Sequence, residues 1–91
     1  MPTLGWTIEL SSAAERQLRK LDRSTTKRLV AYLRQLTADA SNPRRKGKAL
    51  TGPLAGLWRY RVGDHRIICQ LQDDHLIVLV VRLGHRSRID D

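Results

Sequence analysis

The sequence predicts a single small α+β domain, in which two N-terminal helices pack on one face of a mainly antiparallel sheet. Two observations support this fold class. Apolar residues recur at helical spacing in the first half of the chain, whereas the second half has one stretch that alternates apolar with polar residues and two that are richer in β-branched residues. At 91 residues the chain is long enough for one small domain and not for two, so 1–91 is expected to be one unit with the order βααβββ.

The chain is expected to begin with a strand and a helix. Residues 6–10 alternate apolar with polar side chains, as in a half-buried strand. Ser12 and Glu15 have the spacing of a capping box, in which the serine accepts a hydrogen bond from a backbone N–H and the glutamate reaches back. A first helix is therefore predicted from about Ala13 to Leu21.

A second helix is expected to follow directly. Asp22 or Ser24 is a suitable cap, and leucine and valine residues then form an apolar stripe opposed by basic residues. The helix should end near Ala38, because residues 39–47 contain an Asn-Pro pair and a glycine and are typical of a loop.

Three strands are predicted in the second half, at 57–62, 65–72 and 75–83. Gly63-Asp64 and Asp73-Asp74 are the expected two-residue turns between them, although Asp-Asp lacks the glycine that such turns prefer. A sheet built from these hairpins is antiparallel.

Three arginines are expected on one face of this sheet. Side chains alternate between the two faces of a strand, so Arg59 and Arg61 share a face. If Gly63-Asp64 is a two-residue turn, Arg61 lies opposite Arg66, which joins them. The other face then receives a mainly apolar set that forms a floor for the helices: Trp58, Tyr60, Val62, Ile67, Cys69 and Leu71.

Such a cluster is unfavourable for folding alone, and a ligand would explain it. Like charges directly opposite each other in a sheet destabilise it by roughly 0.2–1 kcal/mol. Guanidinium groups grip phosphate through paired hydrogen bonds and stay charged, so Arg59, Arg61 and Arg66 predict a phosphate-rich ligand. The alternative is a solvated face with no ligand.

The whole chain is strongly basic, and further cations flank the strands. Its 17 Lys and Arg against nine Asp and Glu give a formal charge of +8, which favours polyanionic partners such as nucleic acid. Two stretches are candidates for RNA backbone contacts or for ordinary solvated surface: Arg44, Arg45, Lys46 and Lys48 before the strands, and Arg82, His85, Arg86 and Arg88 at their end.

Several function classes are disfavoured. Cys69 is the single cysteine, so neither an internal disulfide nor a cysteine-based metal site can form, and its apolar neighbours predict a buried thiol. No metal and no cofactor is expected. The start of the chain lacks the pattern of a signal peptide, and the apolar stretch 76–81 is too short to cross a bilayer. A cytoplasmic protein with no membrane partner is therefore expected.

Two motifs resemble a known family. Residues 48–68, KALTGPLAGLWRYRVGDHRII, resemble the core of RelE-family toxins: a leucine–glycine turn, an aromatic–basic–x–basic strand, and a Gly-Asp turn into a strand with an arginine. Residues 80–86, VVRLGHR, resemble that family's terminal Gly-His-Arg motif. With the matching βααβββ order, the resemblance covers nearly the whole chain.

The resemblance implies a toxin of a type II toxin–antitoxin system that is a metal-independent endoribonuclease. Such an enzyme enters the ribosomal A site and cleaves messenger RNA by attack of a ribose 2′-OH on the adjacent phosphate. By position, Arg59, Arg61, Arg66 and Arg86 match the family's residues that bind RNA and stabilise the transition state. The resemblance also implies an acidic, RelB-like cognate antitoxin, and no specific DNA binding by the toxin without it.

Proton-transfer groups follow less directly from the residues. Histidine suits both proton roles near neutral pH. His65 is expected on the face opposite Arg66 and His75 at the far end of the sheet, whereas His85 adjoins the terminal arginine and is the better candidate. Many relatives carry a tyrosine a few positions past Gly-His-Arg; Asp90 stands near that position here, which leaves the general acid unassigned.

Three alternatives remain open. ParE toxins share this fold but poison DNA gyrase through protein contacts. A non-catalytic RNA-binding module would hold RNA without cutting it, and a degenerate toxin would still bind its antitoxin. The arginine set favours the nuclease, and mRNA cleavage as opposed to gyrase-dependent DNA damage is the discriminating observation.

Overall fold

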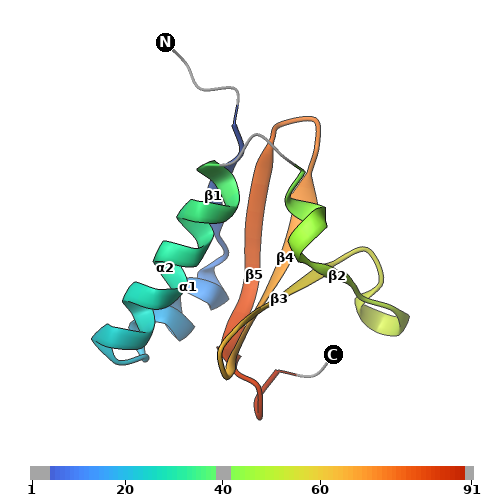
Figure 1. Ribbon diagram of the computed structural model, residues 1–91. Coiled ribbons are helices and arrows are strands. Elements are labelled where there is room, and N and C mark those ends of the chain that lie inside the picture. The colour runs from blue at the N-terminus through green and yellow to red at the C-terminus, as the bar shows by residue number, and fades with distance from the viewer. Residues whose placement is uncertain (1–4, 39–41, 90–91) are drawn as a thin grey trace.

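The computed structural model describes residues 5–38 and 42–89, and it confirms the α+β fold class. Two helices and two short 3₁₀ helices accompany a five-stranded sheet in this part of the chain (Figure 1). In chain order the elements are β1 (Thr7–Leu10), α1 (Ser12–Arg19), α2 (Arg23–Ala38), the 3₁₀ helix η1 (Pro43–Lys46), β2 (Lys48–Ala49), the 3₁₀ helix η2 (Gly52–Leu54), β3 (Trp58–Val62), β4 (His65–Gln72) and β5 (Ile77–His85).

The sheet is mainly antiparallel, as predicted, with the order β1-β5-β4-β3-β2. β1 runs parallel to β5, while β2, β3, β4 and β5 form antiparallel neighbours. The first strand of the chain thus pairs with the last, which makes β5 an inner strand rather than an edge.

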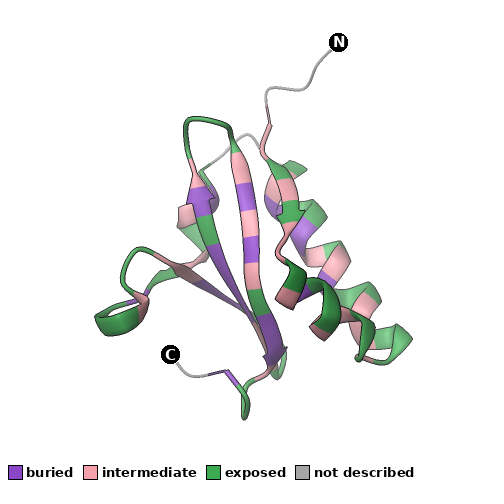
Figure 2. Ribbon diagram, turned by 180° about the vertical axis from the view of Figure 1, so that it is seen from behind, coloured by how far each residue is buried: buried purple, intermediate pink, exposed green. Residues whose placement is uncertain are grey.

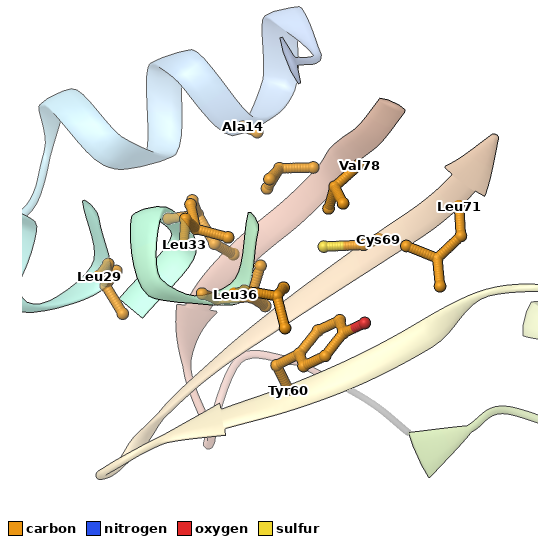
Figure 3. Packing of buried hydrophobic residues seen from close by; sticks show 11 residues of the cluster. Ala14, Leu29, Leu33, Leu36, Tyr60, Cys69, Leu71 and Val78 are labelled. Atoms are coloured by element: carbon orange, nitrogen blue, oxygen red, sulfur yellow. The ribbon is translucent and has the colours of Figure 1, made fainter. Parts of the chain in front are cut away.

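Both helices cover one face of the sheet, and the main core lies between the two layers (Figure 2). Ala14 of α1 and the leucines of α2 meet Tyr60 and Cys69 of the sheet in one buried cluster (Figure 3). All six residues predicted as the floor of this layer belong to the cluster or pack against it. Burial raises the pKa of the Cys69 thiol to about 12, so it stays protonated at neutral pH and is a packing residue, as predicted.

The helix caps agree with the sequence at one helix and differ at the other. At α2, Asp22 accepts hydrogen bonds from the Thr25 backbone N–H at 3.1 Å and from its hydroxyl at 2.6 Å, so Asp22 is the cap. At α1 the predicted capping box was wrong by one residue, because Ser11 accepts from the Ala14 N–H at 3.0 Å. Ser11 also donates to the carbonyl oxygen of Val81 at 2.8 Å, a long-range contact that favours it over Ser12.

Of the two turns predicted between the strands, one is confirmed and one was wrong. Val62 pairs with His65, which confirms the two-residue turn Gly63-Asp64, and Gly63 has the positive φ of 59° that this turn requires. The turn predicted at Asp73-Asp74 was wrong: Gln72 pairs with Ile77, and four residues make the connection. Leu76 adopts a φ of 53° there in place of the missing glycine. As a result β5 starts and ends two residues later than predicted.

The segment before β3 has more structure than a loop. Of the stretch predicted as loop, residues 39–41 lie outside the described residues, whereas Pro43–Lys46 form η1. The Tyr60 hydroxyl donates to the carbonyl oxygen of the buried Pro43 at 2.9 Å, which fixes η1 against β3. None of η1, β2 and η2 was predicted. These elements are only two to four residues long, and their formation depends on packing against the sheet.

Candidate functional site

The predicted arginines share the face of the sheet that the helices leave uncovered. Arg61 pairs directly with Arg66 across β3 and β4, as the two-residue turn predicts. Arg59 precedes Arg61 by two residues on β3, so it lies on the same face. Because their neighbours Tyr60 and Ile67 are in the helix-covered core, these arginines point away from the helices.

Two further cations join them through strand pairing. Lys48 of β2 pairs with Arg59, and Ile68, which also pairs with Arg59, pairs with Arg82 of β5. Residues paired across a sheet share a face, so Lys48 and Arg82 belong with the arginines. We call this surface the basic face and define it by Lys48, Arg59, Arg61, Arg66 and Arg82.

Arg82 reaches the basic face because β5 is irregular. The pairing of β4 with β5 shifts between Ile68 and Cys69: Cys69 pairs with Val80, and Ile68 pairs with Arg82. Val81 is therefore an extra residue, as in a β-bulge. A regular register continued from the Cys69–Val80 pair would have turned Arg82 toward the helices.

Arg59 is the buried member of the basic face. It is 6% exposed, whereas Arg61 is exposed and Arg66 is half-buried. Burial lowers the pKa of the Arg59 guanidinium from its usual value, and the nearby charges of Arg61 and Arg66 lower it further. A partly desolvated cation between like charges gains most when an anion binds beside it.

A small apolar cluster lies on the same side of the sheet, and the sequence did not predict it. Leu50, Ile68 and Ile89 are buried together, and Leu54 and Leu57 pack against them. The available signal was the uninterrupted run Ile67-Ile68-Cys69, because a strand buried on one face alone would carry a polar residue at position 68. We call this set the second cluster.

An open hollow of about 350 Å³ lies at the β2 side of the basic face. It is lined by Lys46 and Gly47 at the end of η1, by Lys48, and by Arg59 and Arg61. Gly47 packs tightly here, since a side chain would come within 2.9 Å of the Tyr60 ring. Four cations around one hollow form a surface suited to phosphate.

Arg66 and Arg86 both lie at the Gly63-Asp64 turn. The Arg66 guanidinium donates to the carbonyl oxygens of Gly63 and His65 at 3.0 and 2.9 Å. The Arg86 backbone N–H donates to the Asp64 carbonyl oxygen at 2.7 Å, and its side chain lies 3.7 Å from the Asp64 carboxylate. The turn thus brings Arg86, a predicted site residue, to the end of the sheet where Arg66 lies. The ion pair between Arg86 and Asp64 is exposed to solvent and therefore weak.

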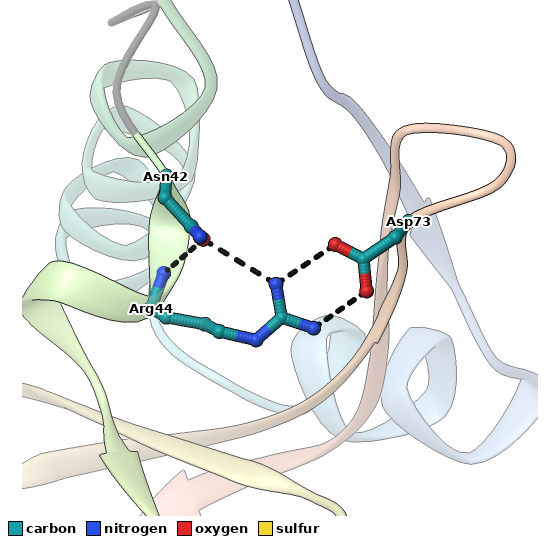
Figure 4. A network of polar contacts seen from close by, with 3 residues as sticks. All are labelled: Asn42, Arg44 and Asp73. Carbon is teal, nitrogen blue, oxygen red and sulfur yellow. Dashed lines mark hydrogen bonds and ion pairs between the residues drawn. The ribbon is translucent and has the colours of Figure 1, made fainter.

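Arg44 makes contacts that its loop position did not indicate. Its guanidinium donates to both carboxylate oxygens of Asp73 at 2.8 and 2.6 Å, and it lies 5.6 Å from the Trp58 ring (Figure 4). This hydrogen bonding raises the pKa of Arg44 and lowers that of Asp73. Trp58 belongs to the helix-covered side, so Arg44 ties η1 to the β4–β5 turn and is not on the basic face.

The remaining cations predicted to bind RNA lie in different places. Lys46 lines the hollow, whereas Arg45 is exposed on η1 and does not line it. Arg88 is exposed after β5 and lines a separate hollow with Gln17 of α1 and with Lys20, the residue that follows α1.

Strand pairing places His85 on the opposite face of the sheet from Arg66. His85 pairs with His65, and their ring centres are 5.6 Å apart. His65 in turn pairs with Val62, so both histidines share the helix side, and the argument that disfavoured His65 applies equally to His85. His85 alternates with Gly84, which pairs with Arg66, so His85 lies on the other face of the sheet from Arg66, although it directly precedes Arg86. Asp90 lies outside the described residues.

Between residues 5–38 and 42–89, no group of three or more His, Cys, Asp or Glu side chains is arranged to hold a metal ion. In the same part of the chain, no helix has the length and apolar character needed to cross a membrane.

Sequence comparisons link the chain to toxins. A family model described as "ParE toxin of type II toxin-antitoxin system, parDE" matches residues 8–90. Toxin RelG of Mycobacterium tuberculosis is 33% identical over 85 residues, which are 92% of this chain and 94% of that protein. Toxin RelE of the same organism is 29% identical over 80 residues, 88% of this chain and 80% of that protein.

Solved structures agree with these relatives. The toxin–antitoxin complex RelBE2 of Mycobacterium tuberculosis contains a chain with a TM-score of 0.81 and 30% identity, covering 91% of this chain and 100% of that one. The isolated RelE toxin of E. coli has a TM-score of 0.73 at 17% identity, covering 93% of this chain and 88% of that one, which shows a shared fold.

A family model that spans nearly the whole chain, relatives named as RelE-type toxins and the matching fold agree on one group. The chain belongs to the RelE/ParE superfamily of type II toxin–antitoxin toxins, as a RelE-family member.

Proposed function

We propose that this toxin is a metal-independent endoribonuclease that cleaves messenger RNA in the ribosomal A site, in the cytoplasm. The observation that supports it best is the basic face, where five cations from four strands point to the side that the helices leave open. A surface that needs to fold and nothing more has no reason to keep Arg61 directly opposite Arg66.

The chemistry requires charge stabilisation at phosphate. A ribose 2′-oxygen loses its proton and bonds to phosphorus, the bond from phosphorus to the 5′-oxygen breaks, and that oxygen takes up a proton. Negative charge builds up on the phosphorane between these steps, and preorganised cations stabilise it. Arg59, Arg61 and Arg66 are proposed for this role, with Lys46, Lys48 and Arg82 holding the flanking backbone.

The test is primer extension on a translating mRNA with purified wild-type protein and Arg61→Ala. Arg61 is exposed, so its removal leaves the core intact. Loss of one transition-state donor costs about 10²–10³-fold in rate. Arg16→Ala, an exposed arginine of α1 on the helix side, is the control and should cleave at the wild-type rate. Equal cleavage by both variants would remove the basic face as the site, and no cleavage by folded wild type would end the nuclease proposal.

A second candidate is supported by the family model, whose description names a ParE toxin. A ParE-like protein would poison DNA gyrase through protein contacts and leave mRNA intact. Wild type that causes gyrase-dependent DNA breaks without mRNA cleavage would establish that function in place of the first. A non-catalytic RNA-binding or degenerate toxin would do neither.

An acidic, RelB-type antitoxin is the proposed partner. Two of the similar structures are named as RelBE complexes, from Mycobacterium tuberculosis and E. coli, and a third as a RelE–RelB complex from Pyrococcus horikoshii. A formal charge of +8 complements an acidic segment that folds on binding. Specific DNA binding is expected of the complex and not of the toxin alone.

A further inference from the structure

We infer that Ile89 is a positioning residue: it completes an apolar wall that excludes water from Arg59 and so strengthens this arginine's hold on a phosphate. The inference rests on the proposed function for its catalytic consequence, but the shielding of Arg59 can be measured separately. Ile89 does not carry charge and is not part of the motifs that resemble known toxins.

Two backbone hydrogen bonds hold the chain segment that follows β5. The Arg86 N–H donates to the Asp64 carbonyl oxygen at 2.7 Å, and the Arg88 N–H donates to the His85 carbonyl oxygen at 2.8 Å. These bonds reverse the chain, and Figure 1 shows it turning to the side of the sheet away from the helices. Ile89 is thereby returned to the side that carries the basic face.

Ile89 occupies a buried position among apolar side chains. It is 6% exposed and is buried with Leu50 and Ile68 in the second cluster. Its Cδ1 atom lies 3.6 Å from the position that a Cβ atom would occupy at residue 84. Gly84 therefore leaves space on β5 that Ile89 fills, next to Ile68 on β4.

The second cluster extends from Ile89 to the neighbours of Arg59. Ile68 is the residue directly paired with Arg59, and Leu57, just before β3, lies two positions before Arg59 in the chain and packs against the second cluster. Leu50 lies two positions after Lys48, the other pairing partner of Arg59. Members of the second cluster thus lie next to Arg59, which is 6% exposed although it stands on a sheet face without a helix above it.

The consequence follows from electrostatics. A guanidinium with little water around it interacts more strongly with phosphate than a solvated one, because the effective dielectric is lower. Truncating Ile89 would open Ile68 and the border of Arg59 to water. The charge would remain, but its stabilisation of developing negative charge would weaken.

The experiment compares Ile89→Ala with Ile89→Val in the full chain. Solvent exchange of the Arg59 Nε–H, followed by nitrogen-15 NMR, should accelerate by about tenfold or more in Ile89→Ala and stay near the wild-type rate in Ile89→Val. Val30→Ala, which trims a half-buried residue on α2, is the matched control and should leave that exchange unchanged.

Cleavage provides the second measurement. Ile89→Ala should lower kcat roughly tenfold with little change in KM, since it weakens an interaction made chiefly in the transition state. Unchanged Arg59 exchange in Ile89→Ala would overturn the inference, as would accelerated exchange with unchanged kcat in an active enzyme. If wild type does not cleave RNA, the proposed function fails, while faster exchange still supports the shielding by Ile89 and unchanged exchange still refutes it.

Discussion

The two faces of the sheet bury apolar residues for different purposes. On the helix-covered face, Tyr60, Ile67 and Cys69 are fully buried under two helices. On the basic face, Leu50, Ile68 and Ile89 form a much smaller cluster among cations, without a helix above them. The main core is much the larger of the two, so we expect the first face to supply most of the stability of the domain and the second to shape the surroundings of Arg59. Neighbouring residues of β4 belong to each, so the difference can be tested one residue apart.

The largest expected effect comes from Ile67→Ala compared with Ile68→Ala. Ile67 is 0% exposed in the main core, so its truncation should lower the free energy of unfolding by about 2–5 kcal/mol. Ile68 lies in the small second cluster, whose surroundings collapse more readily, and its truncation should cost about 1–3 kcal/mol. Urea unfolding measures both. Equal losses, or a larger loss for Ile68→Ala, would contradict the division of roles between the faces.

A smaller effect is expected from Lys48→Ala on RNA binding. Lys48 pairs with Arg59 and lines the hollow, so its loss should weaken affinity for a single-stranded oligonucleotide several-fold and reduce the salt slope by about 0.7. Arg45→Ala removes an exposed cation three residues earlier that does not line the hollow. Fluorescence anisotropy at several salt concentrations distinguishes them, and identical slopes would mean that charge alone, not the hollow, attracts RNA.

The smallest expected effect is on acid stability, through Arg44. Its hydrogen bonds lower the pKa of Asp73 in the folded protein, so their contribution is present above the unfolded pKa of Asp73 and is lost as pH falls through the folded value. Arg44→Ala should therefore flatten the dependence of unfolding free energy on pH below about pH 4, with RNA binding unchanged. Asp22 keeps its own Thr25 hydrogen bonds and supplies a residual slope. A full loss of RNA binding in Arg44→Ala would instead indicate that Arg44 contacts RNA.

Much of this arrangement could be predicted because it depends on local rules. Alternation along β3 and the two-residue turn at Gly63-Asp64 were enough to bring Arg59, Arg61 and Arg66 to one face. The apolar stripe of α2 and its Asp22 cap likewise depend on spacing within one helix.

Prediction failed where a distant contact outweighed a local preference. Ser11 replaced Ser12 as the α1 cap because its hydroxyl also reaches Val81. The ion pair of Arg44 was not predicted either, because nothing in its loop indicates that Asp73, 29 positions away in sequence, accepts hydrogen bonds from both of its terminal nitrogens.

Residue periodicity and one glycine turn were sufficient to predict the α+β class, the helix-covered floor and the common face of the three strand arginines. Three features were visible only in the folded molecule: the bulge at Val81 that turns Arg82 outward, the helix-side position of His85, and the packing of Ile89 against Ile68. The physical reason is that periodicity fixes which residues of one element share a face. Bulges, chain reversals and the pairing of distant elements are settled by packing and hydrogen bonding between segments that no local pattern connects.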